Sequence, residues 1–434
     1  MSQKILISHG RLIDPSSGVE GPLDVAIADG KILALGAIPA SFQPDFVLDA
    51  SGCHVAPGLV DLSARLREPG YEHAGMLASE LAAAAAGGVT SLVCPPDTDP
   101  VLDEPGLIEM LRYRSQLQGS ARVFPLGALT RGLKGEVLTE MVALTEAGCI
   151  AFGQAEVPLA DTQVLQRAMQ YAATFGYTVW LRPQEIHLGK GVAASGPLAT
   201  RMGLSGIPVA AETIALHTIF ELVKSTQAKV HLARISSAEG VALVAQAKRD
   251  GLPVTCDVSI NSLHLCDIDM GYFDSRMRLN PPLRQQRDRD ALRTALANGT
   301  VDALVSDHTP VDDDAKALPF AESEPGATGL ELLLSLTLKW CIDSGVPFIQ
   351  GLERITCAPG KLLGSLSNTS GCGRLSVGGW ADICVFDPQA TWVVTSKALK
   401  SQGKHTPFSA YELPGQVRYT LVGGRLAFQS DAIS

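Results

Sequence analysis

A chain of 434 residues, 46% of them hydrophobic, is long enough to bury one large core and too apolar to stay disordered. Its formal net charge of −10 argues against the basic face that nucleic-acid binding needs, so we expect no nucleic-acid partner. No uncharged apolar run approaches the ~18 residues of a membrane span, so we expect no membrane span either.

The nine cysteines are odd in number and scattered, with no Cys-x-x-Cys pair. This pattern indicates neither a disulfide framework nor a structural zinc site. The first five residues lead directly into a strand-like pattern without a long apolar stretch, so we expect no secretory signal. We therefore predict a cytoplasmic location.

The first 56 residues have the pattern of β-structure. Residues 25–27 and 31–35 are apolar and flank Asp29-Gly30, a two-residue combination typical of a hairpin turn. Other turn signals occur at residues 14–15 and 51–52. We predict a small antiparallel β-structure for this part of the chain.

From Pro57 onward, short apolar runs alternate with helical patterns. Residues 76–86 form an alanine-rich helical stretch that ends at Gly87-Gly88, and a buried strand is predicted at 89–94. Further strands are predicted at 122–124, 149–152, 178–181, 229–232, 253–258 and 303–306. Strands that alternate with helices indicate a parallel sheet, and the number of units favours a (β/α)8 barrel over an open sheet.

After about residue 365 the β pattern returns. Strands are predicted at 382–386, 391–394, 417–422 and 425–428, with a hairpin turn at Gly423-Gly424. β-structure thus flanks the barrel at both ends of the chain. We predict a composite β-sandwich domain from residues 1–56 and 366–434, beside a barrel domain at 57–365.

Five separate motifs, in order along the chain, resemble those of dihydroorotases, which belong to the cyclic amidohydrolases. The segment Pro57–Gly70 resembles the family signature, and residues 94–100 resemble its Met-Pro-Asn-Thr-x-Pro loop. Residues 280–284 read Asn-Pro-Pro-Leu-Arg as in the family, and 305–310 and 325–331 resemble its next two loops. The resemblance implies a TIM barrel of the metal-dependent amidohydrolase type, with a small β-sandwich formed by both termini.

The chain departs from the family at the positions that bind metal. Where the family has His-x-His at the end of the first strand, this chain has Ser63 and Arg65. Where the family has an aspartate or a carboxylated lysine, the best match is Gln154. The two remaining histidines are replaced by Arg182 and Arg234.

Of the metal-binding and catalytic set, the resemblance leaves only Asp307. Arginine stays protonated and has no lone pair to give to zinc, which needs at least three suitable protein ligands. We therefore predict that the zinc site is lost, that no cofactor is bound and that the chain is not an enzyme. Asp307 would then be a remnant without an activated nucleophile to deprotonate.

The three arginines suggest how the barrel could keep its shape without metal. Arg65, Arg182 and Arg234 would supply the missing positive charge, with Asp307 as their partner. Arg67 and Asn280 keep residue types that in the family contact the substrate's carboxylate, so they are candidate ligand-binding remnants. Asp97 replaces a substrate-binding asparagine, and its charge would repel a carboxylate.

His231 and His308 lie beside the replaced ligand positions. One histidine and one aspartate do not make a metal site, so we interpret both as hydrogen-bonded core histidines.

The resemblance leads to one main functional prediction and two alternatives. The main prediction is a non-catalytic subunit in pyrimidine biosynthesis that supports assembly or activity of aspartate carbamoyltransferase, in a homo- and hetero-oligomer. The first alternative is an active dihydroorotase that converts carbamoyl aspartate to dihydroorotate by an atypical route. The second is a non-catalytic binder of a carboxylate from this pathway.

Overall fold

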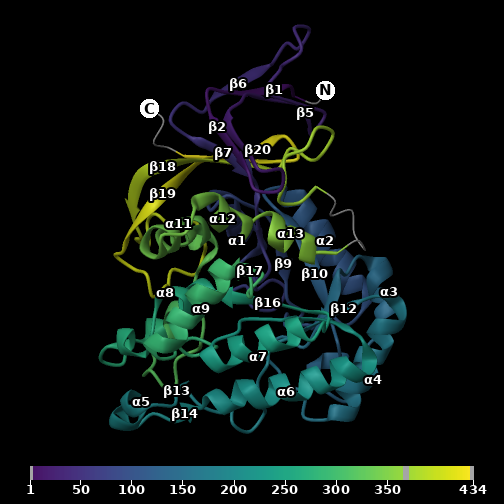
Figure 1. Ribbon diagram of the computed structural model, residues 1–434, viewed down its shortest axis with the longest axis vertical. Coiled ribbons are helices and arrows are strands. Elements are labelled where there is room, and N and C mark those ends of the chain that lie inside the picture. Colours follow the sequence, from purple (N-terminus) through teal and green to yellow (C-terminus); the bar gives the residue numbers. More distant parts are fainter. Residues whose placement is uncertain (1–2, 365–370, 431–434) are drawn as a thin grey trace.

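The computed structural model describes residues 3–364 and 371–430. In Figure 1 the β-rich part lies at one end, where both termini are found, and the helix-covered barrel forms the wider end. The predicted domain boundary at residue 366 lies outside the described residues, and the division into two domains stays a prediction. Among the described helices, none combines the length and apolar character needed to cross a bilayer.

Eight parallel strands form a nearly closed barrel, which confirms the predicted fold class. Their order in the sheet is β17-β16-β15-β12-β11-β10-β9-β8. The strands are β8 (Leu59–Asp61), β9 (Val89–Cys94), β10 (Arg122–Ala128), β11 (Ala151–Gly153), β12 (Thr178–Leu181), β15 (Lys229–Leu232), β16 (Val254–Ser259) and β17 (Ala303–Val305). Nearly all of their residues are buried, as expected for parallel strands covered on both faces.

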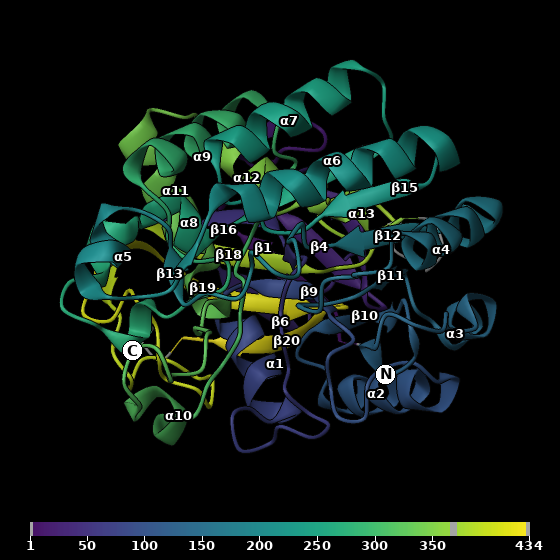
Figure 2. The same cartoon turned by 90° about the horizontal axis from the view of Figure 1, so that it is seen from below.

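Helices surround the barrel, as Figure 2 shows from below. The longer ones are α1 (Leu77–Ala86), α2 (Pro105–Gln118), α3 (Met141–Ala147), α4 (Thr162–Phe175), α6 (Val209–Thr226), α7 (Ala238–Arg249), α9 (Gln286–Asn298) and α11 (Leu333–Ser344). Shorter helices are α5 (Pro197–Met202), α8 (Ile260–His264), α10 (Asp313–Ala317), α12 (Phe348–Glu353) and α13 (Cys357–Leu362). A two-stranded sheet, β13 (Ala193–Ala194) and β14 (Gly206–Ile207), lies in the loop region after β12.

β8 and β17, the first and last strands of the barrel, do not form a continuous ladder of hydrogen bonds with each other. Other polar contacts link them instead. Just beyond them, the backbone N–H of Arg65 donates to the His308 carbonyl at 2.8 Å. The buried carboxylate of Asp61 accepts hydrogen bonds from the Ser306 backbone N–H at 3.1 Å and from the Ser306 hydroxyl. Asp61 also accepts the N–H of Ser63 at 3.2 Å. This carboxylate therefore links β8 to the end of β17.

Both termini contribute to the β-sandwich. One sheet has the order β5-β4-β1-β6 and the other β20-β19-β18-β7-β2-β3. Their strands are β1 (Ile5–Ser8), β2 (Arg11–Asp14), β3 (Val19–Pro22), β4 (Val25–Ala28), β5 (Lys31–Leu35), β6 (Phe46–Asp49), β7 (His54–Pro57), β18 (Ile383–Val393), β19 (Glu412–Val422) and β20 (Arg425–Gln429). The antiparallel pairing of β7 with β18 brings the two ends of the chain together.

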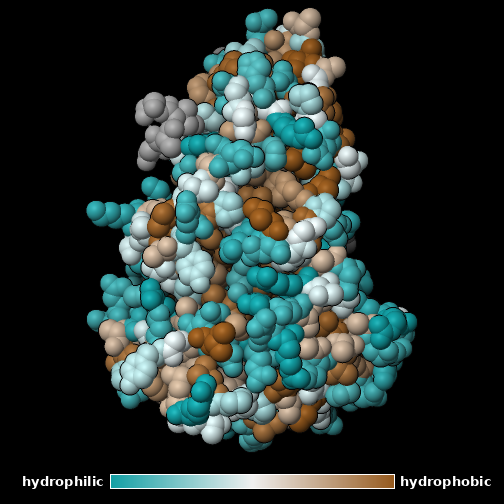
Figure 3. Space-filling view, turned by 60° about the vertical axis from the view of Figure 1, so that its left-hand side comes forward, coloured by the Kyte–Doolittle hydropathy of each residue, from teal (hydrophilic) through white to brown (hydrophobic). Residues whose placement is uncertain are grey.

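The predicted hairpins at residues 29–30 and 423–424 are confirmed as the β4–β5 and β19–β20 turns. The separate strand predicted at 391–394 is wrong, because those residues continue β18 across an irregularity between Asp387 and Thr391. Figure 3 shows a mostly hydrophilic face with scattered hydrophobic side chains, which is ordinary for a folded surface. The largest apolar cluster spans the barrel and the adjoining faces of β18 and β19, and a second cluster fills the interior of the β-sandwich.

Asp61 gives the barrel seam a pH dependence. Burial raises the pKa of Asp61 to about 6, although bonds from Ser306 and Ser63 oppose the rise. An aspartate in the unfolded chain has a pKa of about 3.9. Between that pH and the folded pKa, Asp61 is protonated in the folded chain and ionised in the unfolded chain. The free energy of unfolding therefore falls as the pH rises through this window.

We therefore expect Asp61→Asn, which keeps the shape and can donate to the Ser306 hydroxyl, to remove this fall. Relative to the variant, the free energy of unfolding of the native chain should fall by about 3 kcal/mol between about pH 4 and pH 7. Urea unfolding at both pH values measures the difference. Parallel pH profiles for the two proteins would contradict this prediction.

Candidate active site at the barrel mouth

The polar residues singled out in the sequence lie where barrel strands end. Arg65 follows β8, Arg182 follows β12, Arg234 follows β15 and Asp307 follows β17. Parallel strands place their carboxyl ends at the same edge, which in TIM barrels is the site of catalysis. Arg234 (φ 56°) and Asp307 (φ 53°) are held in the left-handed backbone region, which side chains rarely adopt outside functional or turn positions.

Glu156, two residues beyond Gln154, is the centre of the mouth. Its carboxylate accepts from Arg65 at 2.9 Å and from Arg182 at 2.8 Å, and it also pairs with Arg234. The Asn280 amide donates to the same carboxylate at 2.9 Å. The three arginines that the sequence analysis expected to converge do so, on Glu156.

The arginines keep Glu156 ionised. Burial alone would raise the pKa of Glu156, but the charges of Arg234, Arg182 and Arg65 outweigh it and hold the pKa far below its usual range. Each of the three arginine side chains is no more than 7% exposed. Removal of this carboxylate would leave three buried cations without their shared partner.

Asp307 pairs with one of these arginines. Arg234 donates to Asp307 at 2.9 Å, so the expected partnership holds for this arginine, while Glu156 serves all three. Burial raises the pKa of Asp307, and the positive charges of Arg234 and Arg65 only partly offset this. A raised pKa makes the carboxylate a better proton acceptor near neutral pH.

The rim of the mouth carries two further ion pairs. Arg65 donates to Asp97 at 2.8 Å, so the negative charge of Asp97 is neutralised inside the site. Arg67 (φ 64°) donates to the Pro310 carbonyl at 2.8 Å and to Glu324 at 3.0 Å. Glu324 is 44% exposed, and its side chain is therefore the rim carboxylate that moves most easily.

Together these residues form a charge-balanced group that we call the mouth cluster. It contains four guanidinium groups and four carboxylates, so its formal charge is zero: Arg65, Arg67, Arg182, Arg234, Asp97, Glu156, Asp307 and Glu324. A cavity of about 160 Å³ opens onto it. An anionic ligand could enter this cavity only by displacing a carboxylate or by binding with a proton.

The donors at the mouth do not fit a divalent metal ion. Positions that would hold histidines present a serine and three guanidinium groups, and a guanidinium repels a cation. Within residues 3–364 and 371–430, no group of three or more His, Cys, Asp or Glu side chains is placed to hold an ion. Loss of zinc stays a prediction, which metal analysis of the purified chain can test.

Three other residues from the sequence analysis have structural partners. The Gln154 amide donates to Thr130 at 2.9 Å and to the Leu133 carbonyl at 2.8 Å, so its side chain is committed to the loop after β10. His231 bonds to Asp257 and His308 to Glu80, at 2.9 and 2.8 Å. Both histidines are buried, which confirms their interpretation as core residues.

The sequence analysis missed Glu156 and Glu324. Glu156 stands two positions from the residue aligned with the family's ligand, and only the need for a counter-charge to three arginines could have drawn attention to it. Asn280 was assigned to carboxylate binding. In the structure its amide oxygen accepts from Arg182 at 2.7 Å, so it is a spacer between Arg182 and Glu156.

Comparison with known proteins agrees with this fold. Residues 192–428 match the amidohydrolase family and residues 52–240 the dihydro-orotase-like family. A dihydroorotase-like protein of Pseudomonas aeruginosa is 46% identical over 98% of this chain and 99% of its own length. The chain belongs to the dihydroorotase-like amidohydrolases.

Two further comparisons were informative, one with a relative in sequence and one with a solved structure. A dihydroorotase of Citrifermentans bemidjiense is 37% identical over 98% of this chain and all of its own length. The structure of L-hydantoinase (dihydropyrimidinase) from Arthrobacter aurescens covers 98% of this chain and 96% of that chain, with a TM-score of 0.86 and 22% identity. At that identity the second comparison shows the shared fold.

These relatives correct the prediction that the chain is not an enzyme. Proteins 37% identical to it over 98% of its length bear the name dihydroorotase, and the family is catalytic. The prediction equated the loss of metal ligands with the loss of chemistry. The structure shows that the substitutions leave a cavity lined by arginine and carboxyl side chains, including Asp307.

Glu156 should be essential for stability. We expect Glu156→Gln to lower the free energy of unfolding by about 3–5 kcal/mol, because three buried guanidinium groups lose a shared counter-charge. Glu324→Gln is the matched control: it removes a half-exposed carboxylate from one arginine and should cost less than about 1 kcal/mol. Urea unfolding near neutral pH compares them. Similar losses in the two variants would show that Glu156 is not the centre of the mouth.

Proposed function

We propose that this chain is a cyclic amide hydrolase that interconverts carbamoyl aspartate and dihydroorotate at the mouth cluster. The observation that carries the proposal is the convergence of three buried arginines on Glu156, which lines a cavity together with Asp307 at the carboxyl ends of the barrel strands. Relatives named dihydroorotase support the choice of substrate. The route differs from that of the family, because guanidinium groups and a carboxylate take the place of a metal.

Substrate binding would start at the rim. A carboxylate of the substrate would displace Glu324 from Arg67, since Glu324 is the most exposed carboxylate of the cluster and can be solvated when it leaves. The exchange of one anion for another keeps the cluster neutral. Planar bidentate pairing of arginine with a carboxylate favours this arrangement.

In the hydrolytic direction, a water oxygen forms a bond to the ring carbonyl carbon while Asp307 accepts the proton of that water. The negative charge that develops on the carbonyl oxygen is stabilised by guanidinium N–H groups, which act as an oxyanion site. The ring C–N bond then breaks, and the nitrogen leaves as the ureido NH2 group after it takes the proton from Asp307. Ring closure is the same path in reverse.

Asp307→Asn should reduce turnover at least about a hundredfold, because it removes the proton acceptor. The matched control is Asp290→Asn, a surface change on α9, which should leave turnover unchanged. The assay follows carbamoyl aspartate and dihydroorotate with chain purified from a host that lacks its own dihydroorotase, with and without a chelator. Absence of turnover above buffer, or activity that a chelator abolishes and zinc restores, would overturn the proposal.

Association with aspartate carbamoyltransferase is a separate proposal that stays untested. The chemistry supports it, because carbamoyl aspartate is formed by a carbamoyl transfer and consumed by ring closure. A tagged chain should retain carbamoyltransferase activity when it is isolated from native extract, whereas an untagged extract passed over the same resin should not. Elution of the carbamoyltransferase in a separate, smaller particle would contradict the association.

A further inference from the structure

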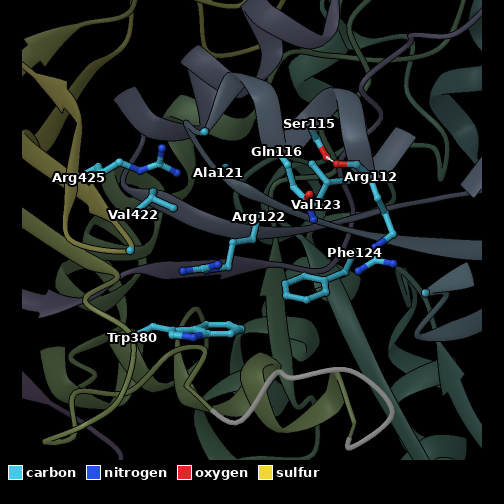
Figure 4. A pocket seen from close by; sticks show the side chains of 13 residues that line it. Arg112, Ser115, Gln116, Ala121, Arg122, Val123, Phe124, Trp380, Val422 and Arg425 are labelled. Carbon is cyan, nitrogen blue, oxygen red and sulfur yellow. Dashed lines mark hydrogen bonds between the residues drawn. The ribbon is translucent and has the colours of Figure 1, made fainter. Parts of the chain in front are cut away.

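A second cavity, of about 310 Å³, lies where the barrel meets the β-sandwich. Arg122, at the floor of this cavity, is the first residue of β10. The mouth cluster lies beyond the carboxyl end of the same strand. The two sites are therefore at opposite ends of the barrel. Figure 4 shows Arg425 and Val422 at one side, Arg112 and Phe124 at the other, and Arg122 between them above Trp380. The walls thus come from α2, β10 and the β19–β20 turn.

The arginine at the floor of this junction pocket is held by several contacts. Arg122 donates to the buried carboxylate of Asp382 at 2.8 and 3.2 Å, and its guanidinium lies 3.9 Å from the Trp380 ring centroid. The same carboxylate accepts the backbone N–H of Gly423 at 2.6 Å. A partly buried ion pair therefore links β10 of the barrel to the start of β18 at the pocket.

The other two arginines have no carboxylate partner in the described part of the chain. Arg112 makes one hydrogen bond, from Nη1 to the Ala147 carbonyl at 2.8 Å, and Arg425 makes no side-chain bond to described residues. A guanidinium group offers five N–H donors, so most of theirs remain available. In a chain with a net charge of −10, two unpaired cations that face one cavity are an anion-binding arrangement.

Glycines lie against each guanidinium. A Cβ at Gly148 would stand 2.2 Å from Nη1 of Arg112, and one at Gly119 would stand 3.4 Å from Nη2 of Arg425. Both glycines have positive φ and end helices, so the turn geometry explains their identity. Because neither glycine has a side chain, the guanidinium groups of Arg112 and Arg425 can lie close to the backbone at the edge of the cavity.

The lining also has an apolar part. Ala121, Val123 and Phe124 form part of the wall on the barrel side, and Val422 on the sandwich side. Gln116, on the exposed face of α2, adds an amide group with no hydrogen-bond partner among the described residues. A volume of this size is at the lower end of small-molecule sites. The pocket therefore combines unpaired guanidinium groups, a polar amide and an apolar surface.

We propose that this junction pocket is a second binding site, for a small phosphomonoester with an organic group of up to nucleoside size. The phosphate would bind Arg112 or Arg425, because arginine forms bidentate hydrogen bonds with phosphate oxygens. The organic group would lie against Phe124 and Val422. Such a ligand bridges α2 and the β19–β20 turn, and its binding would stabilise the junction of barrel and sandwich.

The test is calorimetric titration of the full chain with adenosine 5′-phosphate, ribose 5-phosphate, inorganic phosphate and adenosine. We expect the two esters to bind more tightly than inorganic phosphate, and adenosine not to bind. Arg425→Gln should weaken ester binding at least about tenfold, and Arg112→Gln/Arg425→Gln should abolish it, since each charged hydrogen bond is lost. Arg287→Gln, an exposed change on α9, is the control and should bind as the native chain does.

Three results would overturn the proposal: no ester binding at millimolar concentration, equal binding of inorganic phosphate and the esters, or undiminished binding by the double variant. The last result would place the ligand at the mouth cluster, the other collection of arginines. Circular dichroism and melting of Arg425→Gln show whether the fold is retained. Since Arg425 is exposed and makes no bond to described residues, we expect no change in either.

Discussion

The ionised carboxylate of Glu156 is the constraint on which the barrel mouth depends. Three guanidinium groups from three different strand ends meet on it, and none of them could be buried there alone. Because each arginine follows a different strand, this one residue fixes the relative positions of β8, β12 and β15. Glu156 also shares Arg234 with Asp307, the residue that we propose as proton acceptor.

The charge balance of the mouth cluster has a consequence for ligand entry. Four cations and four carboxylates attract no anion from a distance, so binding requires an exchange at the rim, where Arg67 and Glu324 meet. The junction pocket is different, because two of its three arginines keep free donors. One barrel thus carries a self-neutralised site at its carboxyl end and an uncompensated basic site at the other.

Local sequence patterns predicted most of the elements. Strands 89–94, 178–181 and 229–232 have the predicted limits, because short apolar runs bounded by turn residues have few other buried conformations. The separate strand predicted from residue 391 failed, since pairing with β19 is interrupted after Asp387 but resumes at Thr391 within the same strand. The sequence analysis did not select Glu156, because the family motif aligns Gln154 with the metal ligand. In the structure the Gln154 amide donates hydrogen bonds to the loop after β10.

The sequence by itself determined the alternation of strands and helices, the membership of both termini in a β-structure and the replacement of histidines by arginines. The first two follow from residue types and their spacing, and the third from the resemblance to the dihydroorotase motifs. Only the tertiary structure decided which carboxylate pairs with the arginines, because that choice depends on where loops from distant strands end. The junction pocket was equally hidden, since Arg112 and Arg425 are more than three hundred residues apart and line one cavity only because sandwich and barrel pack together.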